Sequence, residues 1–378
     1  MLRGVMDAAL FRAALGRLPR LTGAQVRNAI AAAGSLQSLA ALPTGELTGL
    51  GWPPAAVAAL RGCDAALPAS DLASCEQHEL RMLAAGEPGY PHTLLEIDAA
   101  PPLLYVRGQV AALSLPQLAI VGSRNPTGAG CASAREFAAH FVRTGLAITS
   151  GLALGIDSAA HEGALAAHGA TIAVCATGLD SVYPESNERL ADRIAASGAL
   201  LSEFPPGTPP RAANFPQRNR LISGLSLGVL VVEAARRSGS LITARCAGDQ
   251  GRDVFAIPGS IHSPQSHGCH QLIRTGAKLV ESAQDVLEEL RIPIQNQILT
   301  LAKSAAAEPG SGLVAMDKDL EILLHALGFA PASLDQLVAR TGLSPGPAAS
   351  MLLMLELQGD IEVAPGGRYR RLVNKGPG

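Results

Sequence analysis

Short apolar segments alternate with helical segments between residues 117 and 280, and this alternation limits the possible fold more than any other feature of the chain. Segments this short and apolar are typical of strands buried on both faces, in a parallel sheet covered by helices. The sequence therefore predicts an α/β fold: an extended Rossmann-like domain with a doubly wound, mostly parallel sheet. The expected strands cover residues 118–121, 146–149, 171–175, 199–201, 228–232, 253–257 and 278–280.

The sequence on either side predicts two smaller domains. The first 75 residues indicate short helices of a SAM-like or helix-hairpin-helix-like kind, and Thr22 is expected to cap a helix over residues 25–33. The C-terminal pattern of three helices and a hairpin around a Pro-Gly-Gly turn is typical of a winged helix. Its third helix carries no lysine or arginine, which favours contact with protein over DNA. The predicted order is a helical domain at 1–75, a bridging segment at 76–115 with a strand at 103–106, the Rossmann-like DNA-binding domain at 116–300, a linker at 301–316 and the winged helix at 317–374.

Charge and composition limit the class of protein. The formal net charge is −2, so a nucleic-acid site would need a local concentration of cations. The six cysteines show no Cys-x-x-Cys spacing, which is typical of buried thiols in a reducing compartment. No apolar run approaches the ~18 residues of a membrane span, and the N-terminus lacks the layout of a signal peptide. We therefore expect a cytoplasmic protein without membrane contact.

The turn Gly122-Ser123-Arg124 follows the first predicted strand of the Rossmann-like domain and opens a helix. Backbone N–H groups and the positive end of a helix dipole favour anions at such a place. Arg124 adds a fork of donors, and Thr127 adds a hydroxyl. A structural glycine turn with a solvent-facing arginine is an equally open interpretation, because the turn lacks the spacing of dinucleotide and NTP loops.

Further loops with glycine, hydroxyl or arginine groups follow other predicted strands. Open α/β sheets bind ligands at the carboxyl ends of their strands, so these loops should line one edge. Together they predict a polar groove too long for one mononucleotide and suited to the phosphates of a strand. The candidate nucleic-acid-binding residues are Gly122, Ser123, Arg124, Thr127, Ser150, Gly151, Gly178, Phe215, Arg218, Asn219, Arg220, Gly239, Ser240 and Thr243.

Three motifs suggest catalysis or metal binding and are better interpreted as structural. Residues 224–228 match Gly-x-Ser-x-Gly, but they lie between a helix and the following strand, whereas a nucleophile elbow lies between a strand and the following helix. Asp157 and His161 are more typical of a helix cap and a packed histidine. The cluster of His262, His267, Cys269 and His270 lacks a second pair with ligand spacing. We therefore predict no catalytic residue, no metal and no cofactor.

The same blocks resemble the DNA-processing protein A family, also called Smf. The matching stretches are Val121-Gly122-Ser123-Arg124, Ser150-Gly151-Leu152-Ala153-Leu154-Gly155-Ile156-Asp157, Gly178-Leu179-Asp180, Phe215-Pro216-x-Arg218-Asn219-Arg220 and Ser238-Gly239-Ser240-Leu241-Ile242-Thr243-Ala244. With their order and spacing they cover nearly all of residues 118–280.

The resemblance implies a non-catalytic recombination mediator that binds and protects incoming single-stranded DNA during natural transformation. It further implies loading of the RecA recombinase and a homodimer formed through the Rossmann-like domain. Arg124, Arg218 and Arg220 are the expected phosphate contacts, which would give a log–log salt slope of roughly −2. Phe215 or Tyr183 is expected to stack a base.

An enzyme is the alternative interpretation. The lysine-decarboxylase-like Rossmann group contains hydrolases that cleave nucleoside monophosphates, with a catalytic Glu in a Pro-Gly-Gly-x-Gly-Thr-x-x-Glu motif. The corresponding loop here is Ser238-Gly239-Ser240-Leu241-Ile242-Thr243-Ala244, and no carboxylate follows it until Asp249. This departure favours DNA binding over hydrolysis.

Overall fold

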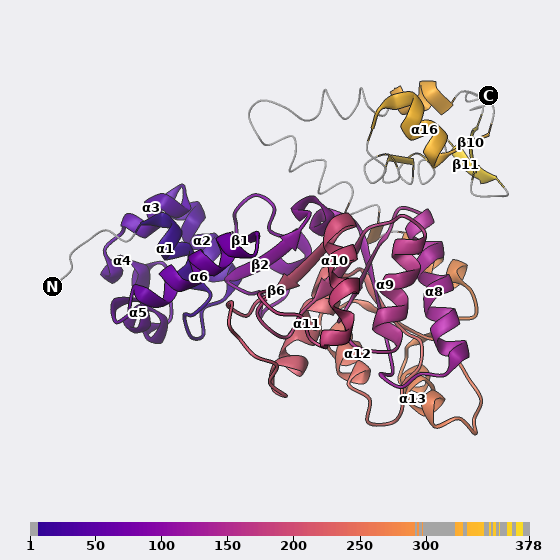
Figure 1. Ribbon diagram of the computed structural model, residues 1–378, viewed down its shortest axis with the longest axis horizontal. Helices are drawn as coiled ribbons and strands as arrows, with labels where there is room; N and C mark the ends of the chain where they lie inside the picture. Colours follow the sequence, from indigo (N-terminus) through magenta and orange to yellow (C-terminus); the bar gives the residue numbers. More distant parts are fainter. Residues whose placement is uncertain are drawn as a thin grey trace.

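The computed structural model describes residues 7–291, 293–294, 297, 322–327, 331–343, 348, 351–352, 355, 361–364 and 368–372. Its strands in the large sheet are β1 (Leu80–Ala84), β2 (Leu103–Gly108), β3 (Gln117–Val121), β4 (Ala147–Ser150), β5 (Thr171–Val174), β6 (Ala199–Ser202), β7 (Gly228–Val231), β8 (Asp253–Ala256) and β9 (Lys278–Leu279). They form a 9-stranded sheet in the order β1-β2-β6-β5-β4-β3-β7-β8-β9. Figure 1 shows β1, β2 and β6 at the end of the sheet nearest the N-terminal helices. All neighbouring strands in the row β6-β5-β4-β3-β7-β8-β9 pair in parallel, which confirms the predicted doubly wound sheet.

The order of the sheet reverses at β3. The chain adds β4, β5 and β6 on one side of it and then returns to add β7, β8 and β9 on the other. Two separate hydrophobic cores lie against the sheet: one contains buried residues of α11, α12 and α13, and the other contains those of α8 and α9. The helices are α8 (Gly128–Arg143), α9 (Ile156–Ala166), α10 (Glu188–Ser197), α11 (Asn214–Leu225), α12 (Ser240–Asp249) and α13 (His267–Arg274).

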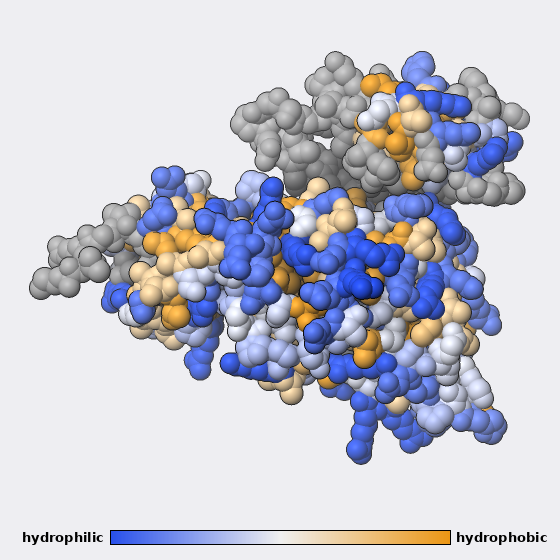
Figure 2. Space-filling model, viewed as in Figure 1, coloured by the Kyte–Doolittle hydropathy of each residue, from blue (hydrophilic) through white to orange (hydrophobic). Residues whose placement is uncertain are grey.

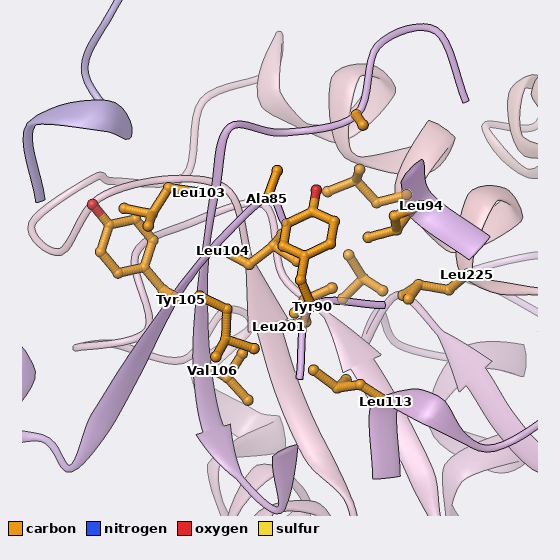
Figure 3. Packing of buried hydrophobic residues seen from close by; sticks show 14 of the residues in the cluster. Ala85, Tyr90, Leu94, Leu103, Leu104, Tyr105, Val106, Leu113, Leu201 and Leu225 are labelled. Carbon is orange, nitrogen blue, oxygen red and sulfur yellow. The ribbon is translucent and has the colours of Figure 1, made fainter. Parts of the chain in front are cut away.

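The segment at 76–115 extends the large sheet. Its strands β1 and β2 pair antiparallel, and β2 pairs antiparallel with β6. Tyr90 and Tyr105 lie among leucines of this extension, and the hydroxyl of Tyr90 donates to Pro101 O at 2.7 Å (Figure 3). The segment also contains α7 (His92–Leu95) and the short 3₁₀ helix η1 (Val110–Ser114).

The N-terminal helices pack against this extension in one continuous hydrophobic core, which includes Phe11, Trp52 and Tyr105. The predicted cap at Thr22 is present as a capping box: Gln25 N donates to the Thr22 hydroxyl at 3.4 Å, and Thr22 N donates to the Gln25 side chain at 3.0 Å. The helices are α1 (Ala8–Leu15), α2 (Gly23–Ala33), α3 (Leu36–Ala41), α4 (Thr44–Gly49), α5 (Pro54–Arg61) and α6 (Ala66–Gln77).

The C-terminal part has a small core of its own, as a winged helix requires. A helical turn covers residues 322–327, and Ser333 caps α16 with a second capping box. A three-stranded antiparallel sheet has the order β10-β12-β11. The predicted linker and the Pro-Gly-Gly turn lie outside the described residues. The elements are α16 (Leu334–Thr341), β10 (Ala332–Ser333), β11 (Ile361–Ala364) and β12 (Arg368–Arg371).

One face of the molecule is mainly polar. On the face seen in Figure 2, hydrophilic side chains predominate over α9 and α10, and apolar ones form small separate patches. Among the helices that the structure describes, none has the length and apolar character that crossing a membrane requires.

Candidate nucleic-acid interface

A groove opens at the point where the order of the sheet reverses, beyond the carboxyl ends of β3 and β7. Ligands of open α/β sheets bind at such a switch point. The groove has a volume of about 680 Å³. Its walls are the turn after β3, the loop after β7 and one side of α11; they include Gly122, Ser123, Arg124, Asn125, Phe215, Arg218, Asn219, Arg237, Gly239, Ser240, Thr243 and Gln265.

The Gly122-Ser123-Arg124 turn lines this groove and is held in place by close packing and hydrogen bonds. A side chain at Gly122 would meet Ile156 at 2.7 Å and the carbonyl of Glu233 at 2.9 Å, so only glycine fits. Ser123 N donates to Glu233 O at 2.7 Å, and Asn125 N donates to the Ser123 hydroxyl at 3.1 Å. These two amides are therefore already bonded within the protein. Fewer backbone N–H groups are therefore free to bind an anion than the sequence predicted. An anion in the groove would depend more on the charge of Arg124.

Arg124 lies exposed at the rim of the groove, above an aromatic ring. Its guanidinium carbon is 5.2 Å from the centre of the Phe215 ring, a cation–π distance. The Tyr183 ring contacts Phe215 with 5.7 Å between centres, and Tyr183 is 48% exposed. One cation and two aromatic rings thus lie together where a phosphate and its base could both be held.

Arg218 lies in the interior instead of reaching toward a phosphate. It is 3% exposed, and its Nη1 donates to Gly151 O at 2.7 Å and to Val174 O. Burial lowers the pKa of Arg218, and the nearby Asp157 opposes this effect. Asp157 in turn accepts hydrogen bonds from Gly151 N at 3.2 Å and Ala153 N at 3.4 Å. Arg218 and Asp157 together hold the loops that follow β4 and β5, so Arg218 has internal partners at a position where a phosphate contact was predicted.

Arg220 also departs from its predicted role. It forms an ion pair with Glu203, and it lines a second cleft on the other side of α11. Arg218 and Arg220 both belong to α11 and lie two residues apart, so they point in different directions.

The other predicted residues divide between the groove and its surroundings. Asn219, Gly239, Ser240 and Thr243 line the groove beside the turn. The Thr127 hydroxyl donates to Glu233 at 2.6 Å, and the Ser150 hydroxyl donates to Ile120 O at 2.6 Å. The predicted residues that do not line the groove are Thr127, Ser150, Gly151, Gly178 and Arg220.

One cation of the groove was not among the residues predicted from the sequence. Arg237 is exposed and lines the wall formed by the loop after β7. It directly precedes Ser238-Gly239-Ser240, so its place beside a glycine-bearing loop was the available signal. Gln265 and Asn125 were missed as well, and Gln265 Nε2 donates to Asn125 O at 2.9 Å across the groove end.

His161 is fully buried behind these loops, as its interpretation as a packed histidine requires. Its Nδ1 is 2.7 Å from the Thr171 hydroxyl, which donates to Ile148 O at 2.7 Å. Within the described residues, no group of three or more His, Cys, Asp and Glu side chains could hold a metal ion. Burial lowers the pKa of His161 from 6.5 to about 3, and Arg218 adds to the effect.

The lowered pKa of His161 predicts a pH-dependent stability. Between pH 6.5 and about 3 the unfolded chain binds a proton at His161 that the folded chain does not. The free energy of unfolding should therefore fall as the pH falls below 6.5, by up to about 1.4 kcal/mol per pH unit. In urea denaturation between pH 6 and 4.5, His161→Gln should reduce this slope, whereas His262→Gln, at an exposed position, should leave it unchanged. An unaltered slope in His161→Gln would contradict the assignment.

The arrangement of sheet, groove and C-terminal unit has counterparts among known proteins. The family model described as DNA recombination-mediator protein A matches residues 81–291, and that of the DprA winged helix domain matches residues 302–367. The chain belongs to the DNA recombination-mediator protein A family. The match to the second model also agrees with the winged-helix fold at the C-terminus.

Members of the recombination-mediator family are similar over most of the chain. Protein Smf of Escherichia coli is 43% identical over 302 residues, which are 80% of this chain and 80% of that protein. The X-ray structure of DNA processing protein A from Streptococcus pneumoniae has a TM-score of 0.65 at 40% identity, over 75% of this chain and 99% of that one. The protein from Helicobacter pylori, whose structure concerns its single-stranded DNA binding mode, has a TM-score of 0.51 at 31% identity, over 56% of this chain and 95% of that one.

Proposed function

We propose that the groove at the switch point binds single-stranded DNA. The observation that carries the proposal is the cluster of Arg124, Phe215 and Tyr183 at the rim, since it offers a phosphate contact next to rings on which bases can stack. Arg237 supplies a second exposed cation on the same groove. The described binding of single-stranded DNA by the H. pylori relative supports the same ligand.

The groove favours a single strand over a duplex for a physical reason. Aromatic faces can stack only on bases that are unpaired or splayed out. Contacts to the backbone alone, in contrast, would serve both forms. Phe215 is half-buried and Tyr183 is exposed, so both rings keep part of their surface available to a base.

We further propose that the protein acts as a mediator of recombination during natural transformation: it protects the bound strand, helps to load RecA and works as a homodimer through the Rossmann-like domain. Membership of the recombination-mediator family supports this role. The exposed apolar side chains Leu279, on the edge strand β9, and Ile261, in the loop after β8, support pairing at that end of the sheet.

An oligonucleotide titration across salt tests the proposed ligand. Because Arg218 and Arg220 are bonded internally, Arg124 and Arg237 are the described groove cations that remain for phosphates. Two phosphate contacts at about 0.7 each predict a slope of about −1.4 when the logarithm of the binding constant for a 20-residue oligothymidylate (dT20) is plotted against the logarithm of salt concentration. A duplex of twenty base pairs should bind more weakly at every salt concentration. Salt-independent affinity, or equal affinity for both forms, would contradict the proposal.

The hydrolase alternative makes a different prediction for the same groove. Among the described residues that line it, Asp157 is the one carboxylate, and its Oδ2 accepts hydrogen bonds from the amides of Gly151 and Ala153. Incubation with nucleoside monophosphates separates the two functions. Release of free base would favour the enzyme, and its absence together with tight dT20 binding would favour the mediator.

A further inference from the structure

A second cleft, of about 310 Å³, lies between the N-terminal helices and the loop that follows β6. One wall comes from residues 16–22 and the other from Phe204, Pro205 and the outward side of α11. A volume at the lower end of ligand pockets suits one small planar group better than a chain. The cleft as a whole was not predicted from the sequence, although its residue Arg220 lies in one of the quoted family blocks.

The polar end of the cleft is an ion pair with unused bonding capacity. Glu203 and Arg220 pair through one oxygen and one nitrogen. The Glu203 side chain is 9% exposed and interacts with Gln217, but its buried oxygen Oε1 makes no hydrogen bond of standard geometry. Arg220 Nη1 is buried and unpartnered as well. A buried polar atom without a partner is destabilising, so an acceptor and a donor here are poised for a ligand.

The charges around these atoms limit the class of ligand. Glu203 opposes an anion and Arg220 opposes a cation, so a neutral group that carries both donors and acceptors fits best. Phe204 is half-buried and lines the cleft, with prolines 101, 102 and 205 around it. Flat apolar walls with one aromatic ring favour a planar ring system.

A nucleobase has these properties, and guanine matches the polar end most fully. Its Watson–Crick edge presents two N–H donors beside the O6 acceptor. The donors would meet Glu203 Oε1, and O6 would meet Arg220 Nη1, while the ring stacks on Phe204. Gln217 is exposed on the same wall and interacts with Glu203, so its carboxamide is the group that an entering base would displace. Arg20 is exposed at the opposite wall, where a phosphate could follow the base.

The cleft and the groove lie on two sides of the same helix. Pro216 lines the groove, and its neighbour Gln217 lines the cleft. A strand that crosses the exposed start of α11 would pass from one to the other. We propose that the cleft between the N-terminal helices and the β6 loop binds one guanine base of the single strand held in the groove, an inference that rests on the proposed function.

Isothermal titration of the full chain with the four deoxynucleoside monophosphates tests the cleft. All four carry the same phosphate, so a preference reports the base alone. We expect dGMP to bind about tenfold more tightly than dTMP, dAMP or dCMP, the discrimination of one well-formed polar pair. Glu203→Gln should abolish the preference, and Phe204→Leu, which leaves the ion pair intact, should weaken dGMP binding. Glu185→Gln is the matched control, because it removes an exposed carboxylate outside the cleft.

Oligonucleotides separate failure of the cleft from failure of the groove. If wild-type protein binds dT20 but a single central dG does not improve binding and dGMP shows no preference, the cleft assignment is overturned while the groove stands. If dT20 does not bind but dGMP is still preferred and Glu203→Gln abolishes that preference, the groove fails and the cleft stands. Equal binding of all four monophosphates overturns the hydrogen-bonding scheme. Phe204→Leu keeps the test decisive if Glu203→Gln does not fold.

Discussion

Arg124→Ala is expected to weaken binding of dT20 by about ten- to hundredfold, the effect of losing one hydrogen bond to a charged group. The same change removes the cation that lies over Phe215, so stacking at the rim should weaken as well. The log–log salt slope should become shallower by about 0.7, because one phosphate contact is lost. Fluorescence anisotropy with labelled dT20 at several salt concentrations measures both quantities.

Arg245→Ala is the matched control for this prediction. Arg245 is an exposed arginine on α12 that does not line the groove, so its loss removes the same charge from a different place. Its effect on dT20 affinity should be small. If both variants lose affinity equally, binding depends on overall charge rather than on the groove. If Arg124→Ala binds like the parent, the proposed site is wrong.

Arg218→Met should lower the free energy of unfolding by about 3–5 kcal/mol, because it removes one partner of a buried charge pair. Asp157 would lose the nearby positive charge that favours its ionised form, and the carbonyls of Gly151 and Val174 would lose their donor. Arg218→Lys should recover part of the loss, since it restores the charge but not the fork of donors. Urea denaturation followed by circular dichroism gives the comparison.

The Arg218 variant also separates two roles for that residue. Arg245→Met, at an exposed position, should change the free energy of unfolding by no more than about 0.5 kcal/mol. A phosphate contact at Arg218 would have the opposite signature: little loss of stability and a large loss of dT20 affinity. That outcome would restore the role first predicted from the sequence.

Much of the sheet was predictable because its strands are nearly pure apolar runs. The central strand β3 is buried at every position, and so is β4, which leaves no polar alternation to obscure the pattern. The glycine turns were predictable in position for the same reason, since each must follow a strand. The extension by β1 and β2 was harder, because two antiparallel strands separated by turns carry no sign of the distant strand β6 that they meet.

The direction of side chains in the groove was not predictable from the motif alone. Arg218 and Arg220 are two residues apart in the sequence, and both were expected to contact the phosphates of one ligand. In the helix α11 such neighbours point to different sides, so one enters the interior and the other faces the second cleft. Burial of Arg218 depends further on Gly151, where a side chain would meet its guanidinium at 2.7 Å. Such a contact between residues 67 positions apart leaves no local mark in the sequence.

The hydrophobic core shared by the N-terminal helices and the extended sheet has a consequence for cooperativity. Phe11, Trp52 and Tyr105 belong to one cluster that continues into the parallel strands. Units joined by such a core unfold together rather than one by one. The helical unit and the α/β sheet are therefore expected to respond to heat or denaturant as a single thermodynamic body, so a loosened contact near Trp52 would reduce the protection of backbone amides in the distant strands.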